Sequence, residues 1–416
     1  MRHHARFSTL LASVVALVTA FVVAYPQLVV AQEYELQGQL DLRSVAVDSP
    51  LTSFARGGMG LLRFDEEHDG LQLGRLLLDF SGPVTETVRA QVTASATADG
   101  DQNPIDFTEA FLEWRPYPDS QWRWRSRIGA FYPPISLENR AIGWQSLYSL
   151  SPSAINTWIG EEMRAMGVEV AATDTGASSG RAFDLTFIGG VYGWNDPMGV
   201  LIFQRGWAIN DRQTTLFGAL PRPLARAGER DIEFFHEIDD RPGYYAGAEM
   251  KWQQGHTLRY MHYDNRGDPS RSNDRDDSWL TRFDSIGARL ELSEHWTLIA
   301  QGLYGDTGVG NSSDGRGALI ADYWSYFTLG SYRTGPHRLS LRYDRMSVES
   351  VRGARFFDSR QNAKAWTAAW MFDWNDHWQA AVEALRIDGT VGERARAGLS
   401  PAAVEEQLQV ALRYSF

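Results

Sequence analysis

Residues 407–416, QLQVALRYSF, are the stretch of sequence that decides the fold we assign to the chain. Polarity alternates strictly along this segment. One face carries Leu408, Val410, Leu412, Tyr414 and Phe416, and the other carries Gln407, Gln409, Ala411, Arg413 and Ser415. Because successive side chains of a β-strand point to opposite faces, the pattern predicts a strand between an apolar and a polar environment.

The same period of two recurs along most of the chain. Residues 36–43, 88–97 and 244–253 each place their charges almost wholly on one parity. A charge of Arg or Lys on the lipid face of a barrel costs about 2–4 kcal/mol at the bilayer midplane, so this segregation is typical of membrane strands. A soluble β-sandwich also alternates, but here aromatic residues gather at the ends of the uncharged faces, as membrane girdles require. The sequence therefore predicts an all-β fold, a transmembrane antiparallel β-barrel.

The period-two segments predict about sixteen strands, joined alternately by short turns and by long polar loops. We expect them at 36–46, 71–80, 87–97, 105–114, 122–131, 164–172, 183–193, 244–253, 256–264, 279–292, 296–305, 319–333, 337–348, 362–374, 377–388 and 404–416. Residues 200–207 and 213–219 could add one hairpin, which would give eighteen strands. The short turns are expected in the periplasm and the long loops outside the cell.

The N-terminus has the features of a secretory signal peptide. A basic start precedes the fifteen-residue apolar run Leu10–Ala24, which is too short to span a bilayer comfortably. Cleavage is expected between Ala31 and Gln32. The domains are therefore a signal peptide at 1–31 and a barrel at 32–416, exported to the cell outer membrane.

Composition excludes several other classes of protein. The chain has no Cys, so it can form neither a disulfide framework nor a thiolate metal site. Its formal net charge of −12 argues against general binding of nucleic acid. Four of the histidines, His256, His295, His337 and His377, each end a short turn, and no spacing typical of metal ligands or phosphate loops appears. We expect no enzyme activity, no cofactor and no metal.

The alternating face of residues 408–416 resembles the last strand of Gram-negative outer-membrane porins, which ends in Phe after apolar or aromatic residues at alternate positions. The resemblance extends to the signal peptide and to the expected strand number, and so covers the mature chain. It implies that Leu408, Val410, Leu412, Tyr414 and Phe416 are the signal read by the barrel-assembly machinery. It also implies a homotrimer in contact with outer-membrane lipid and lipopolysaccharide.

In sixteen-stranded porins the third external loop folds into the barrel and narrows it. Residues 133–163 would be that loop in this chain, although the acidic glycine-rich motif of general diffusion porins is missing. The candidate constriction residues on it are Glu138, Arg140, Glu161 and Glu162.

Charged side chains of the expected inward parity mark the candidate channel lining. They are Arg75, Arg89, Glu109, Glu113, Arg123, Arg125 and Arg127. By analogy with the porins, the arginines could face carboxylates of the third loop and set ion preference. The alternative is that lumen arginines and glutamates pair across neighbouring strands.

The sequence thus predicts an outer-membrane porin with a water-filled channel for passive diffusion of small hydrophilic solutes or ions. One alternative is a substrate-specific anion channel with a lumenal row of arginines. The other is an outer-membrane barrel enzyme or a structural protein with a plugged lumen.

Overall fold

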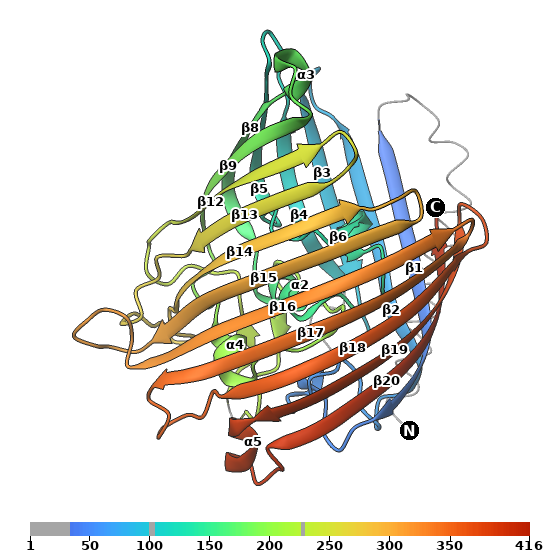
Figure 1. The fold of residues 1–416 in the computed structure, drawn as a ribbon. Helices are drawn as coiled ribbons and strands as arrows, with labels where there is room; N and C mark the ends of the chain where they lie inside the picture. Colours follow the sequence, from blue (N-terminus) through green and yellow to red (C-terminus); the bar gives the residue numbers. More distant parts are fainter. Residues whose placement is uncertain (1–33, 100–104, 226–228) are drawn as a thin grey trace. The chain divides into compact units, whose positions relative to one another are not determined.

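A computed structural model describes residues 34–99, 105–225 and 229–416, and sixteen of its strands form a closed antiparallel barrel (Figure 1). The expected signal peptide, residues 1–31, lies outside the described residues. The barrel closes where the first strand pairs with the last, with Leu42 opposite Leu412. In the described residues no helix is both long and apolar enough to cross a membrane.

The prediction of sixteen strands is confirmed, and three of them have the predicted limits. The barrel strands are β1 (Glu35–Asp48), β2 (Gly70–Pro83), β3 (Val88–Ala96), β4 (Ile105–Trp114), β5 (Trp122–Phe131), β8 (Ala165–Asp174), β9 (Phe183–Gly193), β12 (Gly243–Trp252), β13 (Thr257–Asp264), β14 (Leu280–Glu291), β15 (Trp296–Val309), β16 (Leu319–Thr334), β17 (His337–Arg352), β18 (Gln361–Asp373), β19 (Trp378–Val391) and β20 (Ala402–Ser415). The alternative of eighteen strands is wrong. Within residues 200–207 the chain forms the helix α4 (Val200–Gln204), and no barrel strand includes 213–219.

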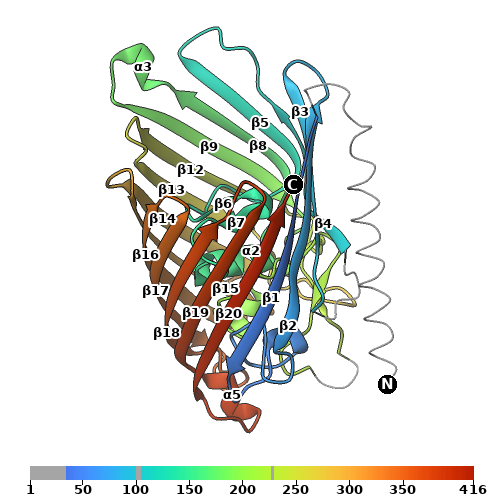
Figure 2. The ribbon, with the colours of Figure 1, turned by 90° about the vertical axis from the view of Figure 1, so that its right-hand side faces the viewer.

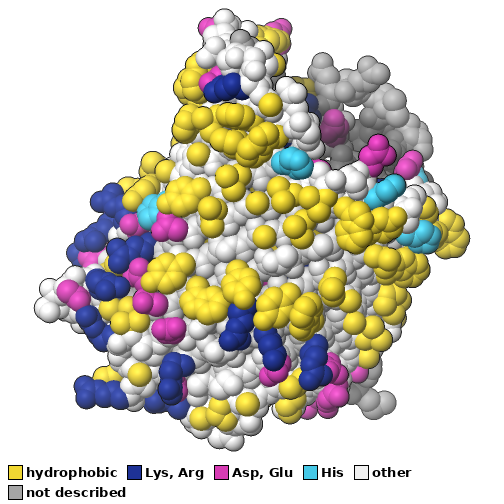
Figure 3. Space-filling view, viewed as in Figure 1, with side chains coloured by type: hydrophobic (Ala, Val, Ile, Leu, Met, Phe, Trp, Pro, Cys, Tyr) yellow, Lys and Arg dark blue, Asp and Glu magenta, His cyan; other side chains and the backbone are white. Residues whose placement is uncertain are grey.

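The outward face of the barrel is uncharged over a broad band, which Figure 3 shows in yellow. Outward aromatic pairs lie at two levels along the strands. Near the short turns, the rings of Trp378 and Tyr414 lie 4.8 Å apart. Farther from the short turns, near the middle of β17 and β18, the rings of Tyr343 and Trp366 are also 4.8 Å apart. These positions suit the two aromatic girdles of an outer-membrane barrel.

Three long connections fold into the barrel instead of extending away from it. The connection 49–69 contains the 3-10 helix η2 (Phe54–Arg56). The connection 132–164, which we call the third loop, contains β6 (Asn139–Ala141), η3 (Ile142–Trp144), β7 (Gln145–Ser146) and α2 (Ala154–Glu162). The connection 194–242, the fourth loop, contains α4, β10 (Ala219–Leu220) and β11 (Ile232–Glu233). The helix α2 lies within the ring of strands (Figures 1 and 2).

An apolar core fills the external half of the lumen, because inward-facing aromatic side chains meet the two inward loops. Trp158 of α2 is fully buried, and its ring contacts Phe283 of β14 at 5.5 Å and Tyr323 of β16 at 5.2 Å, both edge-on. Trp207 of the fourth loop contacts the same tryptophan at 5.5 Å. We call this apolar core, which lies between the inward loops and the strands, the plug.

Candidate functional site: the lumen constriction

The third and fourth loops meet the barrel wall at β2 and leave a small polar cavity there. Its free volume is about 10 Å³, which is about the space of one water molecule. Arg75 of β2, Asn156 of α2 and Gln213 of the fourth loop line it from three sides. The cavity lies between the two loops and the wall, and we call it the constriction.

Several buried side-chain atoms that line this cavity have no hydrogen-bond partner among the described residues. They are Arg75 Nη1, Asn139 Oδ1, Gln145 Nε2, Asn156 Oδ1 and Gln213 Oε1. Buried polar atoms are nearly always satisfied in native proteins. The cavity therefore suits a water molecule or another small polar group.

A cluster of buried, charged side chains surrounds Asp211, which lines the cavity. The carboxylate of Asp211 lies 2.6 Å from Arg43, 3.0 Å from Arg63 and 3.9 Å from Arg75. Burial alone would raise the pKa of Asp211, but these guanidinium groups hold it well below its usual value. The fourth loop is thus fastened to β1, to β2 and to the connection 49–69 at one carboxylate.

Ion pairs among the described residues link five arginines to three aspartates in this cluster. The arginines are Arg43, Arg63, Arg75, Arg212 and Arg413, and the aspartates are Asp41, Asp99 and Asp211. The buried Glu383 also lies near Arg43. Arg75 lies 3.9 Å from the carboxylate of Asp211, farther than Arg43 or Arg63, so its charge is the less closely compensated one.

The loop glutamates have structural partners of their own, so the expected opposition to the wall arginines is not what the structure shows. Glu138 lies 3.0 Å from Arg342 of β17, and Glu161 lies 2.7 Å from Arg205. Both glutamates are fully buried. They anchor the third loop to the wall and to the fourth loop.

Glu162 anchors the start of α4. It accepts hydrogen bonds from the backbone N–H groups of Gly199 at 2.8 Å and Leu201 at 2.5 Å. The indole N–H of Trp158 also donates to it, at 2.6 Å. Burial raises the pKa of Glu162 to about 7, although these hydrogen bonds oppose the shift.

The wall arginines on β5 pair across strands, as the alternative interpretation expected. Arg125 and Arg127 both bind Glu169 of β8, at 3.0 Å and 2.8 Å. Glu169 stands directly opposite Arg127 in the register and also accepts the hydroxyl of Tyr245 at 2.8 Å. Glu169 is not among the residues predicted from the sequence. Its position on the inward-facing side of its strand, opposite Arg127, was the feature that could have identified it. Arg123 is exposed and donates to the carbonyl of Ser120.

The remaining candidate residues lie in different surroundings. Arg89 is opposite Glu113 in the β3–β4 register. Glu109 accepts the backbone N–H of Tyr132 at 3.1 Å, at the start of the third loop. Arg140 is exposed, on β6. Of the predicted channel-lining residues, only Arg75 also lines the constriction cavity.

The last strand closes the barrel with its terminal residue. Phe416 and Gly38 exchange two backbone hydrogen bonds of 3.0 Å. A Cβ on residue 38 would lie 2.2 Å from the Phe416 ring, so the glycine lets the ring pack directly against the strand. The outward side chains Leu408, Val410 and Leu412 are exposed, while recognition by the assembly machinery stays a prediction.

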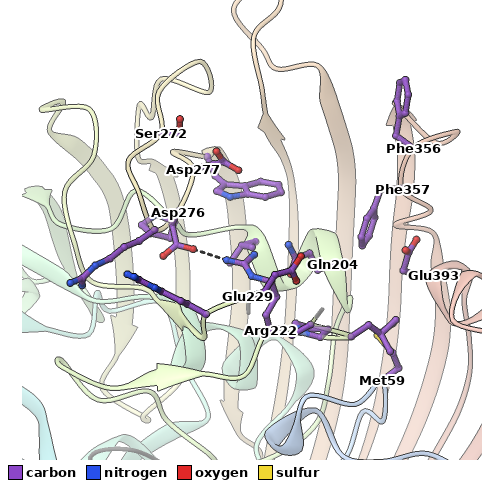
Figure 4. Close-up of a pocket in the computed structure, with 18 of the residues that line it drawn as sticks. Met59, Gln204, Arg222, Glu229, Ser272, Asp276, Asp277, Phe356, Phe357 and Glu393 are labelled. Atoms are coloured by element: carbon purple, nitrogen blue, oxygen red, sulfur yellow. Dashed lines mark hydrogen bonds and ion pairs between the residues drawn. The ribbon is translucent and has the colours of Figure 1, made fainter. Parts of the chain in front are cut away.

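A larger hollow opens among the external loops. It has a volume of about 1080 Å³, with Phe356 and Phe357 on one side and the ion pair of Arg222 and Asp276, at 2.7 Å, on the other (Figure 4). The ring of Phe203 lies 5.1 Å from that of Phe357, which joins this vestibule to the apolar plug.

The raised pKa of Glu162 predicts a pH-dependent stability. The folded state binds a proton at this carboxylate up to about pH 7, whereas the unfolded chain releases it near its usual value of 4.5. Stability is therefore highest below about pH 4.5 and falls as the pH rises to about 7, by about 3 kcal/mol in total. Denaturant unfolding in detergent at several pH values measures this slope.

Glu162→Gln is the variant that tests the source of the slope, with the exposed Glu67→Gln as its control. The glutamine has no proton to lose, so the fall in stability with pH is expected to weaken in Glu162→Gln only. Asp196 keeps part of the slope, because burial and the neighbouring Asp239 and Glu237 raise its pKa to about 7 as well. An unchanged slope in Glu162→Gln would show that this carboxylate ionises normally.

Comparison with known proteins places the fold. No family model and no curated protein matches the sequence. Among solved structures, the outer membrane channel DcaP of Acinetobacter baumannii matches at 15% identity and a TM-score of 0.55, over 92% of this chain and 97% of that chain. Salmonella typhi OmpF in complex with daunomycin matches at 14% identity and a TM-score of 0.52, with the same coverages.

A third similar structure is the trimer form of OmpT, an outer membrane protein of Vibrio cholerae. It matches at 11% identity and a TM-score of 0.52, over 92% of this chain and 99% of that chain. At such identities the likeness concerns the fold. The chain therefore has the sixteen-stranded, porin-type barrel fold of outer-membrane proteins.

Proposed function

We propose that the protein is a narrow, solute-selective channel of the outer membrane that prefers anions. The observation that carries this proposal is the meeting of two inward loops at β2, which leaves between them and the wall a polar cavity of about 10 Å³. A general diffusion pore would need a wide continuous lumen, whereas a selective channel needs close contact between the solute and polar groups. The buried, unsatisfied atoms around Arg75 provide such groups.

The preference for anions follows from the charge at the constriction. Arg75 lies 3.9 Å from the carboxylate of Asp211, and its buried Nη1 has no hydrogen-bond partner among the described residues. In a low-dielectric passage such a charge attracts anions and repels cations. Arg75 alone is therefore proposed to set the anion preference that the sequence suggested for the whole row of wall arginines.

Planar-bilayer recording in asymmetric potassium chloride tests the proposal. We expect small conductance steps with chloride over potassium selectivity, and a fall of about threefold or more in that ratio for Arg75→Gln, since a single charge at a constriction shifts the local potential of both ions. Lys364→Gln is the matched control, because Lys364 lies outside the lumen and pairs with Asp388. Large, unselective steps from the unaltered protein would contradict the proposal.

A barrel with a permanently closed lumen is the second candidate, and the buried fourth loop favours it. Val200, Leu201, Ile202 and Phe203 are all nearly inaccessible to solvent. Such a protein would be structural, or an enzyme acting at its surface. It predicts no conductance from the unaltered protein at any voltage, whereas the channel proposal predicts steps.

The proposal includes the expected setting of the protein. We infer export by a cleaved signal peptide, insertion by the barrel-assembly machinery through residues 408–416, and a homotrimer surrounded by lipid and lipopolysaccharide. The trimer form of a similarly folded barrel supports the homotrimer. Crosslinking in outer-membrane preparations measures the oligomer.

A further inference from the structure

Three side chains form a hydrogen-bonded chain on the outward face of the barrel, away from the lumen. A carboxylate oxygen of Asp284 on β14 lies 2.9 Å from Nδ1 of His262 on β13, and Nε2 of this imidazole lies 3.5 Å from the hydroxyl of Tyr244 on β12. His262 stands directly opposite Asp284 in the register, and its opposite residue on β12 is Ala246. Tyr244, two positions from Ala246, is therefore a diagonal neighbour of His262, within reach of a long side chain.

The carboxylate of Asp284 fixes the tautomer of His262. An ionised carboxylate only accepts hydrogen bonds, so Nδ1 of the imidazole carries the hydrogen and Nε2 keeps a lone pair toward the Tyr244 hydroxyl. Tyr260 also donates to Oδ1 of Asp284, at 2.6 Å, and so holds the carboxylate in place. A nucleophile, a base and an orienting carboxylate in this order make a hydrolytic triad, here with a phenol as the nucleophile.

The triad lies at the loop ends of its strands. Tyr244 is the second residue of β12, His262 is two residues from the end of β13, and Asp284 is the fifth residue of β14. Arginine, carboxylate and histidine side chains gather over these strand ends, at the left of Figure 3. An outward charge is costly in hydrocarbon, so the triad belongs in the interfacial layer of the membrane. Tyr244 and Asp284 are exposed and His262 is half-buried, so a lipid can reach the triad from the side.

We propose that Tyr244, His262 and Asp284 hydrolyse carboxylic esters of membrane lipids at the outward surface of the barrel. The bonds that join acyl chains to head groups lie at the boundary between the hydrocarbon and the polar layer, which the triad faces. No enzyme activity was expected from the sequence, because the three residues come from different strands and only the register brings them together. The activity is separate from the proposed channel, since none of the three lines the constriction.

The reaction needs only the lipid ester and water. His262 Nε2 takes the proton of the Tyr244 hydroxyl while the phenolic oxygen bonds to the ester carbonyl carbon. The bond from this carbon to the lipid alcohol oxygen then breaks, and the imidazolium gives its proton to the departing oxygen. Water attacks the acyl-tyrosine ester in the same way and passes a proton through His262 to the Tyr244 oxygen, which releases the fatty acid. Asp284 stabilises the imidazolium without taking its proton, and is therefore a positioning residue.

Release of fatty acid by the purified protein in vesicles of phosphatidylethanolamine and phosphatidylglycerol tests the activity. Vesicles that also contain lipopolysaccharide, whose acyl chains include esters, form the second arm. Tyr244→Phe removes only the nucleophilic hydroxyl and His262→Gln removes the base, so each is expected to lower the rate at least a hundredfold. Tyr326→Phe is the matched control, because Tyr326 is an exposed outward tyrosine of β16, and it should change the rate less than twofold.

Asp284→Asn separates orientation of the base from a merely structural role. The amide can donate to Nδ1 and favour the other tautomer, so we expect kcat to fall at least a hundredfold while KM stays nearly constant. Conductance and ion selectivity of all four variants should match those of the unaltered protein. No release of fatty acid in either arm, or equal release by the unaltered protein and His262→Gln, overturns the proposal. Release that persists in Tyr244→Phe overturns its role as the nucleophile, and an unchanged kcat in Asp284→Asn overturns the role of the carboxylate.

Discussion

Asp211→Asn is expected to be the most destabilising single change of charge in the lumen. Its carboxylate is the shared partner of Arg43, Arg63 and Arg75, all of which are buried. Removing one member of a buried ion network leaves uncompensated charge, which costs about 3–5 kcal/mol. Because the pKa of Asp211 lies well below its usual value, this stabilisation persists from neutral pH down to strongly acidic pH.

Denaturant unfolding in detergent, followed by tryptophan fluorescence, measures the loss. Asp69→Asn is the matched control, since Asp69 is exposed in the same external region, and it should change stability by less than about 0.5 kcal/mol. Adding Arg75→Met to Asp211→Asn should recover part of the loss, because Arg43 still pairs with Asp41 and Arg63 with Asp99, whereas Arg75 pairs with Asp211. Equal stability of Asp211→Asn and Asp69→Asn would mean that the cluster is hydrated.

The barrel could be predicted from the sequence because lipid imposes one rule on every strand. Each outward side chain that faces the hydrocarbon of the bilayer must be uncharged. Uncharged residues therefore occupy every second position in residues 408–416, and the same pattern recurs in the other strands. Because the turns at one rim are short, the strand ends next to them could be predicted closely. The three strands 105–114, 122–131 and 183–193 begin and end where the sequence analysis placed them.

The fourth loop could not be placed, because no local rule separates a buried helical turn from a strand over a few residues. Residues 200–203, VLIF, are apolar without alternation, and both structures are compatible with such a run. In the structure they form α4, which is held at its start by Glu162, a residue about forty positions earlier in the chain. Only tertiary contact decides between the two alternatives.

One signal for a filled lumen was present in the sequence. The strand β16 carries aromatic residues on both parities: Trp324 and Tyr326 face outward, whereas Tyr323 and Phe327 face inward and are buried. Aromatic rings that faced a water-filled lumen would be exposed to water. Their inward position therefore indicates that other side chains inside the barrel cover them. Arg75 was identified from its parity, but Asp211 was not, because it lies in a loop and meets Arg43 across 168 positions.

Trp158→Ala is expected to loosen the plug and to widen the channel. The Trp158 ring is fully buried against Trp207, Phe283 and Tyr323, and its N–H is bonded to Glu162. Truncating a buried tryptophan costs about 3–5 kcal/mol, through lost burial and a cavity. These contacts join the third and fourth loops to the wall. The loss of stability is therefore expected in the plug, while the barrel strands keep their lipid-facing contacts.

Single-channel recording and unfolding of the same preparation separate these effects. In Trp158→Ala we expect conductance several times that of the unaltered protein, weaker ion selectivity and barrel strands that still resist denaturation in detergent. Trp374→Ala is the control, because Trp374 is 73% exposed at a short turn and touches no inward loop. If Trp158→Ala lowers stability but leaves conductance and selectivity unchanged, ions do not pass beside α2, and the constriction at Arg75 is not on their path.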